Sequence, residues 1–293
     1  MMMNYDILEK KLIDIAKKIS SQSNKQNTLS VSLVPIANRL GADIFLQFVN
    51  KPFRDAQISL NKPYKITLFR KSLDGIETSC KITSRDEKTI TMRERFSVAH
   101  ELGHLIAYNN LQIEPTLPSD KSEYWKQEKL AHSFARKLLL PEALITNWLN
   151  NNDVITINDC YKFASKLRVT LHVLSRSVCE HKKKFGFLKL VSGINEKSGK
   201  KILKVEDSIC SGEFALPKHH AHILNEELVQ ILDSNQANYH QLNNWCFDKE
   251  YNQNNYKISW IKRIVGYASV NHRYLKIQEK YDTFWILFEH VET

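Results

Sequence analysis

The hydrophobic positions of the chain follow two different periods. In residues 4–19 the apolar side chains recur every three or four positions, which predicts an amphipathic helix, and a shorter helix is expected over Val31–Leu40. After Gly41 the apolar residues gather in short runs, punctuated twice by Asn-Lys-Pro, and these runs predict strands of a small sheet. The predicted strands are Ile44–Val49, Ala56–Leu60 and Tyr64–Phe69.

Helix start signals stand at two positions further along the chain. The segment Thr91-Met-Arg-Glu94 has the form of a capping box, in which each polar side chain serves a free backbone amide, so we predict a helix over Met92–Tyr108. Asp120 is placed to cap a second helix over residues 121–140, and Pro141 ends it. Three more helices are expected over Glu142–Leu149, Ile157–Leu167 and Leu171–His181.

The C-terminal part of the chain mixes the two patterns. Ala221–Leu232 and Asn238–Phe247 have helical spacing, and the runs around them predict strands, so this part is expected to be α+β. The predicted strands are Phe185–Val191, Lys201–Val205, Ile264–Val270, Tyr274–Gln278 and Thr283–Phe288. We therefore divide the chain into a domain over residues 1–150, a helical segment over 151–183 and an α+β domain over 184–293.

Composition and charge narrow the class of protein. The 293 residues are 42% hydrophobic and 25% charged, which excludes a wholly disordered chain. There is no apolar run long enough to span a membrane and no apolar signal segment at the start, so a cytoplasmic protein is expected. The net charge of +10 suits anionic partners, but its spread along the chain favours a solvated lysine-rich surface. The five scattered cysteines form no pair typical of zinc or disulfide frameworks.

The most specific motif in the chain is His100-Glu101-Leu102-Gly103-His104. On a helix, residues four positions apart share one face, so both imidazoles can reach one ion. Zinc accepts neutral imidazole nitrogen, and the motif therefore predicts a zinc site with His100 and His104 as ligands. Glu101 lies on the neighbouring face, where it can act as the general base that accepts a proton from a water activated by the metal.

A catalytic zinc takes a third protein ligand and keeps an open position. A third histidine on the same helix is excluded, because Ala107 and Asn110 occupy the positions that such a motif requires. In helix 121–140, Glu128 lies on an apolar face, where a carboxylate is costly to bury unless a cation pairs with it. We therefore favour Glu128 as the third ligand and keep His132, four residues further on, as the alternative. If it is not a ligand, His132 supports one or contacts substrate. The other acids considered are Glu114, Asp120 and Glu123.

Two segments give the chain a resemblance to a known family. Residues 95–104 read Arg-Phe-Ser-Val-Ala-His-Glu-Leu-Gly-His, and residues 128–141 begin Glu-Lys-Leu-Ala-His-Ser-Phe-Ala and end Leu-Leu-Leu-Pro. Together they resemble the RFxxAHELGH and ExxANxFAxxLLxP motifs of the ImmA/IrrE metallopeptidases, over roughly residues 5–181. The chain departs from the pattern at His132, where the family usually has Asn.

The resemblance implies a fold, a site and a function. The expected fold is α+β and zincin-like: a small sheet, the helix that carries the HExxH motif and a second helix that carries the glutamate ligand. Zinc would be held by His100, His104 and Glu128, as in gluzincins, with Glu101 as the base. The resemblance further implies an endopeptidase that cleaves a helix-turn-helix transcriptional repressor and so derepresses genes.

Two other hypotheses compete with this one. The first is a metal-stabilised DNA-binding regulator without catalysis, and the second is a component of a toxin–antitoxin or defence module. The complete motif favours an enzyme, because a structural zinc does not need Glu101. Direct DNA binding stays open: residues 164–174 have helix-turn-helix spacing with Thr170 as the N-cap of the second helix, although a packed helical bundle is favoured. The side chains that would contact DNA are Arg168, His172 and Arg176.

Other groups give weaker signals. A substrate could pair as an extra strand with Ala56–Leu60 or Tyr64–Phe69. For residues 219–222, an exposed basic loop is favoured over a second metal site, and residues 184–293 are interpreted as a sensor or recognition module. The candidates to stabilise an oxyanion are Arg93, Arg95, Tyr108, Tyr124 and Arg136, and Tyr124 is also a candidate to support a ligand or contact substrate.

Overall fold

The chain forms two compact units, each described here by itself. The computed structural model describes residues 5–23, 29–114, 120–194, 201–210, 222–223, 239–245, 254–266 and 280–291. The first unit comprises Met1–Trp148 and Ala164–Val173, and the second comprises Leu149–Phe163 and Leu174–Thr293. No described helix is both long and apolar enough to cross a membrane.

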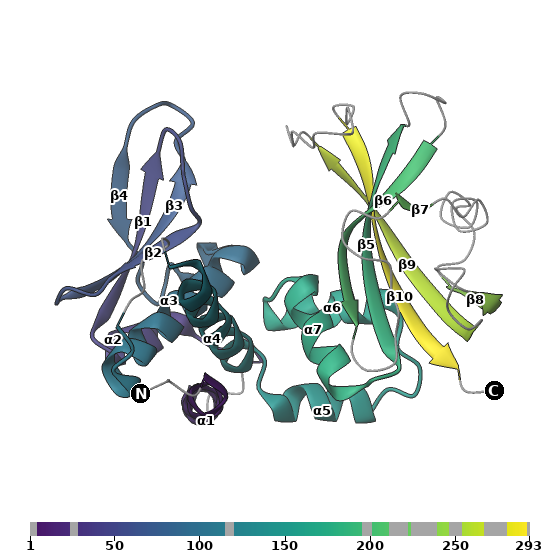
Figure 1. Ribbon diagram of the computed structural model, residues 1–293. Coiled ribbons are helices and arrows are strands. Elements are labelled where there is room, and N and C mark those ends of the chain that lie inside the picture. The colour runs from purple at the N-terminus through teal and green to yellow at the C-terminus, as the bar shows by residue number, and fades with distance from the viewer. Residues whose placement is uncertain are drawn as a thin grey trace. The chain divides into compact units, whose positions relative to one another are not determined.

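The first unit contains a four-stranded sheet in the order β2-β3-β1-β4 (Figure 1). The central strands β1 (Ala42–Val49) and β3 (Tyr64–Lys71) are parallel, and β2 (Ala56–Ser59) and β4 (Thr78–Lys81) lie antiparallel on the two edges. Buried and exposed residues alternate along β3, as expected for a sheet with one face on the core. The three predicted strands of this region are confirmed, and β2 is an edge strand whereas β3 is internal.

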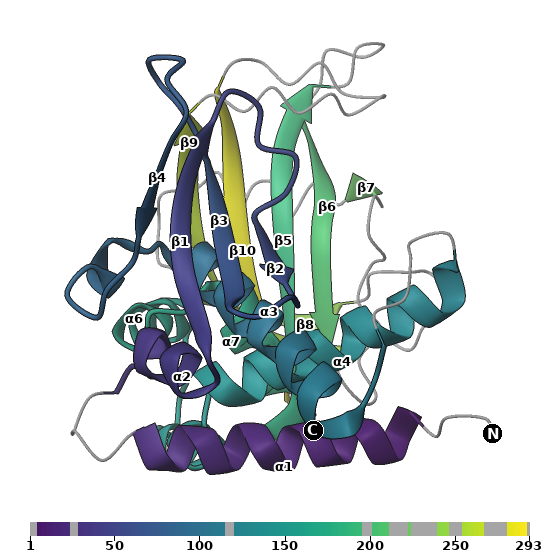
Figure 2. The same cartoon turned by 90° about the vertical axis from the view of Figure 1, so that its left-hand side faces the viewer.

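Helices cover this sheet. α3 (Met92–Leu111) contacts β2 and β3, α4 (Lys121–Leu139) packs on α3, and α1 (Tyr5–Ser23) packs on α4. Figure 2 shows α1 running across the foot of the unit. The short helix α2 (Leu33–Arg39) packs on β1 and α3, and α5 (Glu142–Asn150) follows α4. These helices match the five predicted from the sequence to within a few residues at each end.

Both predicted caps are present. Thr91 Oγ1 accepts a hydrogen bond from the Glu94 amide at 3.2 Å, and Glu94 Oε2 accepts one from the Thr91 amide at 2.7 Å. Asp120 Oδ1 accepts from the Glu123 amide at 3.2 Å at the start of α4. The capping box fixes the first turn of α3 and therefore the position of the histidines further along that helix.

α3 and α4 approach closely at Gly103. A Cβ atom at this position would lie 3.0 Å from Ala131 Cα and 3.2 Å from the Ala131 carbonyl oxygen. A glycine is therefore needed for the observed separation of the two helices. Because α4 also carries Glu128, this contact helps to set the distance between Glu128 and the histidines of α3.

The second unit is built on a six-stranded antiparallel sheet in the order β7-β6-β5-β10-β9-β8. Its strands are β5 (Phe185–Ile194), β6 (Lys201–Cys210), β7 (His222–Ile223), β8 (Tyr239–Trp245), β9 (Asn254–Gly266) and β10 (Lys280–Val291). The helices α6 (Ile157–Leu167) and α7 (Leu171–His181), which the two units share, have the predicted bounds.

Two predicted helices of this unit were wrong where the structure describes them. His222 and Ile223, at the start of the predicted helix Ala221–Leu232, form β7, which pairs with β6. Asn238–Phe247 was expected to be a helix, but Tyr239–Trp245 forms β8, which pairs with β9 at the edge of the sheet. Pairing with a neighbouring strand outweighed the local helical spacing. Most of the predicted helix Ala221–Leu232, the strand Tyr274–Gln278 and the histidines at 219 and 220 lie outside the described residues.

Candidate active site

A cavity of about 800 Å³ is lined by residues of α3, α4 and the edge strand β2 with the segment before it. α3 contributes both motif histidines and Glu101, and α4 contributes Tyr124, Glu128 and His132. Residues of three elements that are distant in sequence therefore meet at one opening, as is usual for a binding site.

Three potential ligand side chains converge in this cavity. His100 Nε2 and His104 Nε2 lie 3.0 Å apart, and the Glu128 carboxylate lies 3.2 Å from the first and 3.4 Å from the second. Zinc–ligand bonds of about 2.0–2.1 Å in tetrahedral geometry place neighbouring ligand atoms about 3.3 Å apart. Glu128 Oε2 is the oxygen near His100 and Oε1 the oxygen near His104, so both carboxylate oxygens lie at distances close to those between ligand atoms of one zinc ion.

The charge states also suit a metal. Burial lowers the pKa of His100, which favours the neutral imidazole. Burial alone would raise the pKa of Glu128, but hydrogen bonds from His100 and His104 lower it well below its usual range, so the carboxylate is ionised. Neutral imidazole and ionised carboxylate are the forms that bind zinc, and the donor set therefore fits this ion.

Glu101 lies beside this group, next to the edge strand. Burial raises the pKa of Glu101, although the backbone amide of Ile58 in β2 donates a hydrogen bond that opposes the shift. A buried carboxylate with a raised pKa is a stronger base than an exposed one, as a proton acceptor requires.

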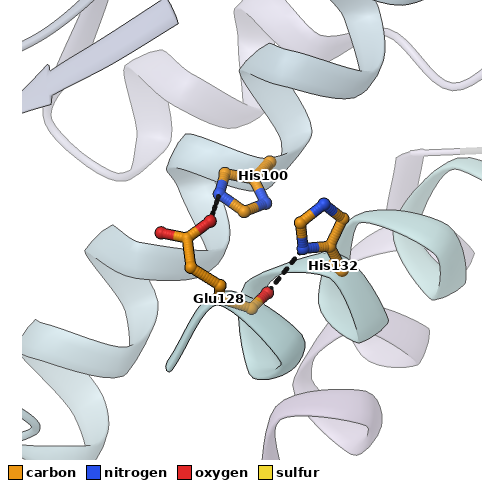
Figure 3. Close-up of side chains that lie close together, drawn as sticks. All are labelled: His100, Glu128 and His132. Atoms are coloured by element: carbon orange, nitrogen blue, oxygen red, sulfur yellow. Dashed lines mark hydrogen bonds and ion pairs between the residues drawn. The ribbon is translucent and has the colours of Figure 1, made fainter. Parts of the chain in front are cut away.

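His132 lies against the same group but makes different contacts. Its Nδ1 donates to the Glu128 backbone carbonyl at 2.7 Å, which leaves Nε2 as the acceptor, and its ring centroid lies 4.5 Å from that of His100 (Figure 3). The buried Nδ1 of His100 has no hydrogen-bond partner among the described residues. Ligand atoms of His100, Glu128 and His132 all lie within 4.8 Å of one another, so His132, the alternative to Glu128 in the sequence, also lies close enough to this group to be a ligand.

Only two of the five candidate oxyanion groups line the cavity. Tyr124 hydrogen-bonds to Glu128, and its pKa is raised by burial and by that carboxylate. Arg93 pairs with Asp55 at 2.8 Å at the opening. Arg95 is 1% exposed and its guanidinium is bound within a buried network, so it was a wrong candidate for the reacting groups. Tyr108 and Arg136 are not among the lining residues.

The structure gives Arg168 contacts that the sequence did not indicate. It adopts a positive φ of 55° in the turn between α6 and α7, and its guanidinium donates to the backbone carbonyls of Glu87, Lys88 and Ile90. A guanidinium that binds three carbonyls of its own unit is poorly placed to contact DNA. The Thr170 hydroxyl accepts from the Val173 amide at 3.4 Å, as its predicted capping role requires.

The sequence analysis missed the residues that precede β2. Phe53, Arg54 and Asp55 line the cavity, together with Gln57 and Ile58 of β2. Their only signal was the possibility that Ala56–Leu60 forms an edge strand.

The segment that contains the site is similar to a known protein family. Residues 86–178, which include the whole HExxH motif and Glu128, match the IrrE N-terminal-like domain, Peptidase_M78. This match supports the resemblance of the chain to the ImmA/IrrE family. This peptidase family implies a metal and a protein substrate for the IrrE N-terminal-like domain.

A solved structure shares the fold over most of the chain. A Mycobacterium tuberculosis transcriptional regulator is 11% identical, with 96% of this chain and 88% of that chain covered and a TM-score of 0.51. At this identity the likeness concerns the fold alone. No curated protein sequence matches the chain.

Proposed function

We propose that the protein is a zinc-dependent endopeptidase, with His100, His104 and Glu128 as zinc ligands and Glu101 as general base. The observation that carries the proposal is that the ring nitrogens of His100 and His104 and the Glu128 carboxylate lie 3.0–3.4 Å apart, beside the buried Glu101. We include His104 in the ligand set because its Nε2 lies 3.0 Å from His100 Nε2 and 3.4 Å from a Glu128 carboxylate oxygen.

The residues of the chain have separate roles in this proposal. Zinc, when bound, supplies Lewis acidity that activates water and polarises the scissile carbonyl. Glu101 takes the proton of the attacking water and returns it to the leaving amine. The Tyr124 hydroxyl lies at the carboxylate of Glu128 and is the best-placed donor to the carbonyl oxygen as charge develops there.

The edge strand β2 supports binding of an extended peptide. No described strand pairs with its outer side, and the Ile58 amide hydrogen-bonds to Glu101. A peptide that adds to this edge would pass directly over the reacting groups, and its backbone would be held by ladder hydrogen bonds.

The biological substrate that we propose is a helix-turn-helix transcriptional repressor in the cytoplasm, whose cleavage derepresses genes. The family resemblance supports this step. The competing hypothesis is a metal-stabilised DNA-binding regulator, or a member of a toxin–antitoxin or defence module, in which the metal site does no chemistry.

Two isosteric variants separate these hypotheses. Glu101→Gln keeps all three ligands, so zinc content should stay near one per chain, while cleavage falls by about 10²–10⁴-fold, the usual contribution of general-base catalysis. Glu128→Gln replaces a ligand by a neutral amide, so zinc affinity itself should fall. Glu123→Gln, on the same helix and paired with Lys126, is the matched control and should change neither property.

Zinc is measured by elemental analysis of purified protein, and cleavage by comparing new protein termini in cells that express each variant. Termini that appear with the wild type and vanish with Glu101→Gln identify the substrate. If Glu101→Gln generates the same termini as the wild type, or derepresses genes equally well, proteolysis is not the mechanism and the non-catalytic regulator is the better account.

A further inference from the structure

Two arginines lie at the opening of the cavity, and only one of them has a carboxylate partner. Arg93 Nε donates to Asp55 Oδ2 at 2.8 Å. Arg54, the neighbour of that aspartate, forms no ion pair within the described part of the chain. Its charge is therefore available to a ligand.

Arg54 is held in place by aromatic contacts and not by an acid. The centre of its guanidinium lies 4.5 Å from the centroid of the Phe53 ring. Phe53 in turn packs on Phe69 of β3, with ring centroids 5.4 Å apart, although it is 69% exposed. A large exposed aromatic side chain that carries a guanidinium at a cavity opening is a typical feature of a recognition surface.

Arg54 lines the same cavity as Glu101 and Tyr124. Arg54 also stands two residues before β2, so a peptide that pairs with this edge strand would pass close to it.

The two other charged pairs of the cavity are formed without Arg54. Asp55 is paired with Arg93, and Glu128 accepts from the two motif histidines. Among the described residues, Arg54 is thus a cation without an ion-pair partner at the opening of a cavity that is suited to bind a peptide.

We propose that Arg54 binds a carboxylate of the substrate, so that the enzyme selects peptides with Asp or Glu close to the scissile bond. This inference rests on the proposed function in one respect, namely that the cavity binds peptide. The carboxylate can belong to a side chain or to the C-terminus of the peptide, because the guanidinium fork recognises both in the same way.

The test measures peptide retention and does not require cleavage. The full-length Glu101→Gln protein is loaded with zinc, immobilised and exposed to a random peptide library, prepared once with free and once with amidated C-termini. The retained pool is sequenced. With Arg54 present, acidic residues should be enriched by about two- to fivefold at one position, the range expected for an exposed charge pair. In the Arg54→Gln variant this enrichment should disappear.

Three further variants make the outcome specific. Arg54→Glu should reverse the preference toward Lys and Arg. Arg54→Lys should give a weaker acidic preference, because it keeps the charge but loses the fork and the stacking on Phe53. The double variant Asp55→Asn with Arg93→Gln removes the neighbouring ion pair at constant net charge, and it should leave the acidic preference intact.

Each result decides the question. Acidic enrichment in both libraries assigns a side-chain carboxylate, and enrichment confined to free C-termini assigns the terminal one. The proposal is overturned if no peptides are retained, if the retained peptides show no acidic preference, or if the preference persists in Arg54→Gln. If the acidic enrichment is found but the wild-type protein generates no new termini in cells, the proposed peptidase function is contradicted and the binding preference stands.

Discussion

Arg95 offers the clearest separation of a structural role from a catalytic one. Arg95 lies in α3, five residues before His100, yet it is only 1% exposed. Its guanidinium donates to the Glu87 carboxylate at 3.0 Å and to the Ser30 hydroxyl at 3.0 Å. It also donates to the backbone carbonyls of Val31 and Arg168. Replacing Arg95 by Met keeps most of the volume and removes all of these bonds.

The size of the effect follows from what the substitution leaves behind. Breaking a buried ion pair by removing one partner costs about 3–5 kcal/mol of unfolding free energy. The remaining Glu87 carboxylate keeps the Ser32 hydroxyl and the Leu33 amide, both at 2.6 Å, and the Val34 amide at 3.3 Å. Because the acid is not stranded, we expect the lower end, about 3 kcal/mol. At about 2–4 °C per kcal/mol for a unit of this size, Tm should fall by about 6–12 °C.

Urea and thermal unfolding of purified Arg95→Met, followed by circular dichroism, measure this loss. Arg93→Met is the matched control: its side chain is 78% exposed in an ion pair, so it should change the unfolding free energy by less than about 1 kcal/mol. Below the transition, folded Arg95→Met should still bind zinc. An unchanged Tm together with lost cleavage would refute the argument and return Arg95 to the reacting groups.

Three further outcomes are expected. Gly103→Ala places a Cβ 3.0 Å from Ala131 Cα, and the overpacking should shift the helix that carries Glu128. The loss in zinc-binding free energy should therefore exceed the loss in unfolding free energy, and an unchanged zinc affinity in a titration would contradict this. Burial acts to raise the pKa of Glu94, but the hydrogen bonds from Arg70 and Thr91 outweigh it, so the pKa in the folded protein lies below the ordinary value of 4.5. Its ionised form therefore stabilises the fold above that pH, and Glu94→Gln should cost about 1–2 kcal/mol at pH 7 and progressively less in urea titrations below pH 4. Burial raises the pKa of the Cys160 thiol, so a thiol reagent should modify exposed Cys80 in the native protein and Cys160 only after unfolding, as mass spectrometry can measure.

The sequence determined the features of the fold that depend on near neighbours. The capping box, the bounds of α6 and α7 and the shared face of His100 and His104 follow from contacts within four residues along the chain. Such contacts can be read from the sequence, because a helix satisfies its own backbone and fixes its own periodicity. The same local logic placed Glu128 on the apolar side of α4.

Only the tertiary structure decided which distant groups meet. The local spacing of Tyr239–Trp245 indicated a helix, but a free strand edge on β9 made it a strand. Arg95 and Arg168 look like surface charges in the sequence, and the fold surrounds both with acceptors from distant segments. No sequence pattern indicated a role for Arg54, because its lack of an ion pair follows from the pairing of Asp55 with the distant Arg93. Pairing across long stretches of chain depends on geometry that no local pattern encodes, and at this site that geometry sets which charged side chains pair with one another.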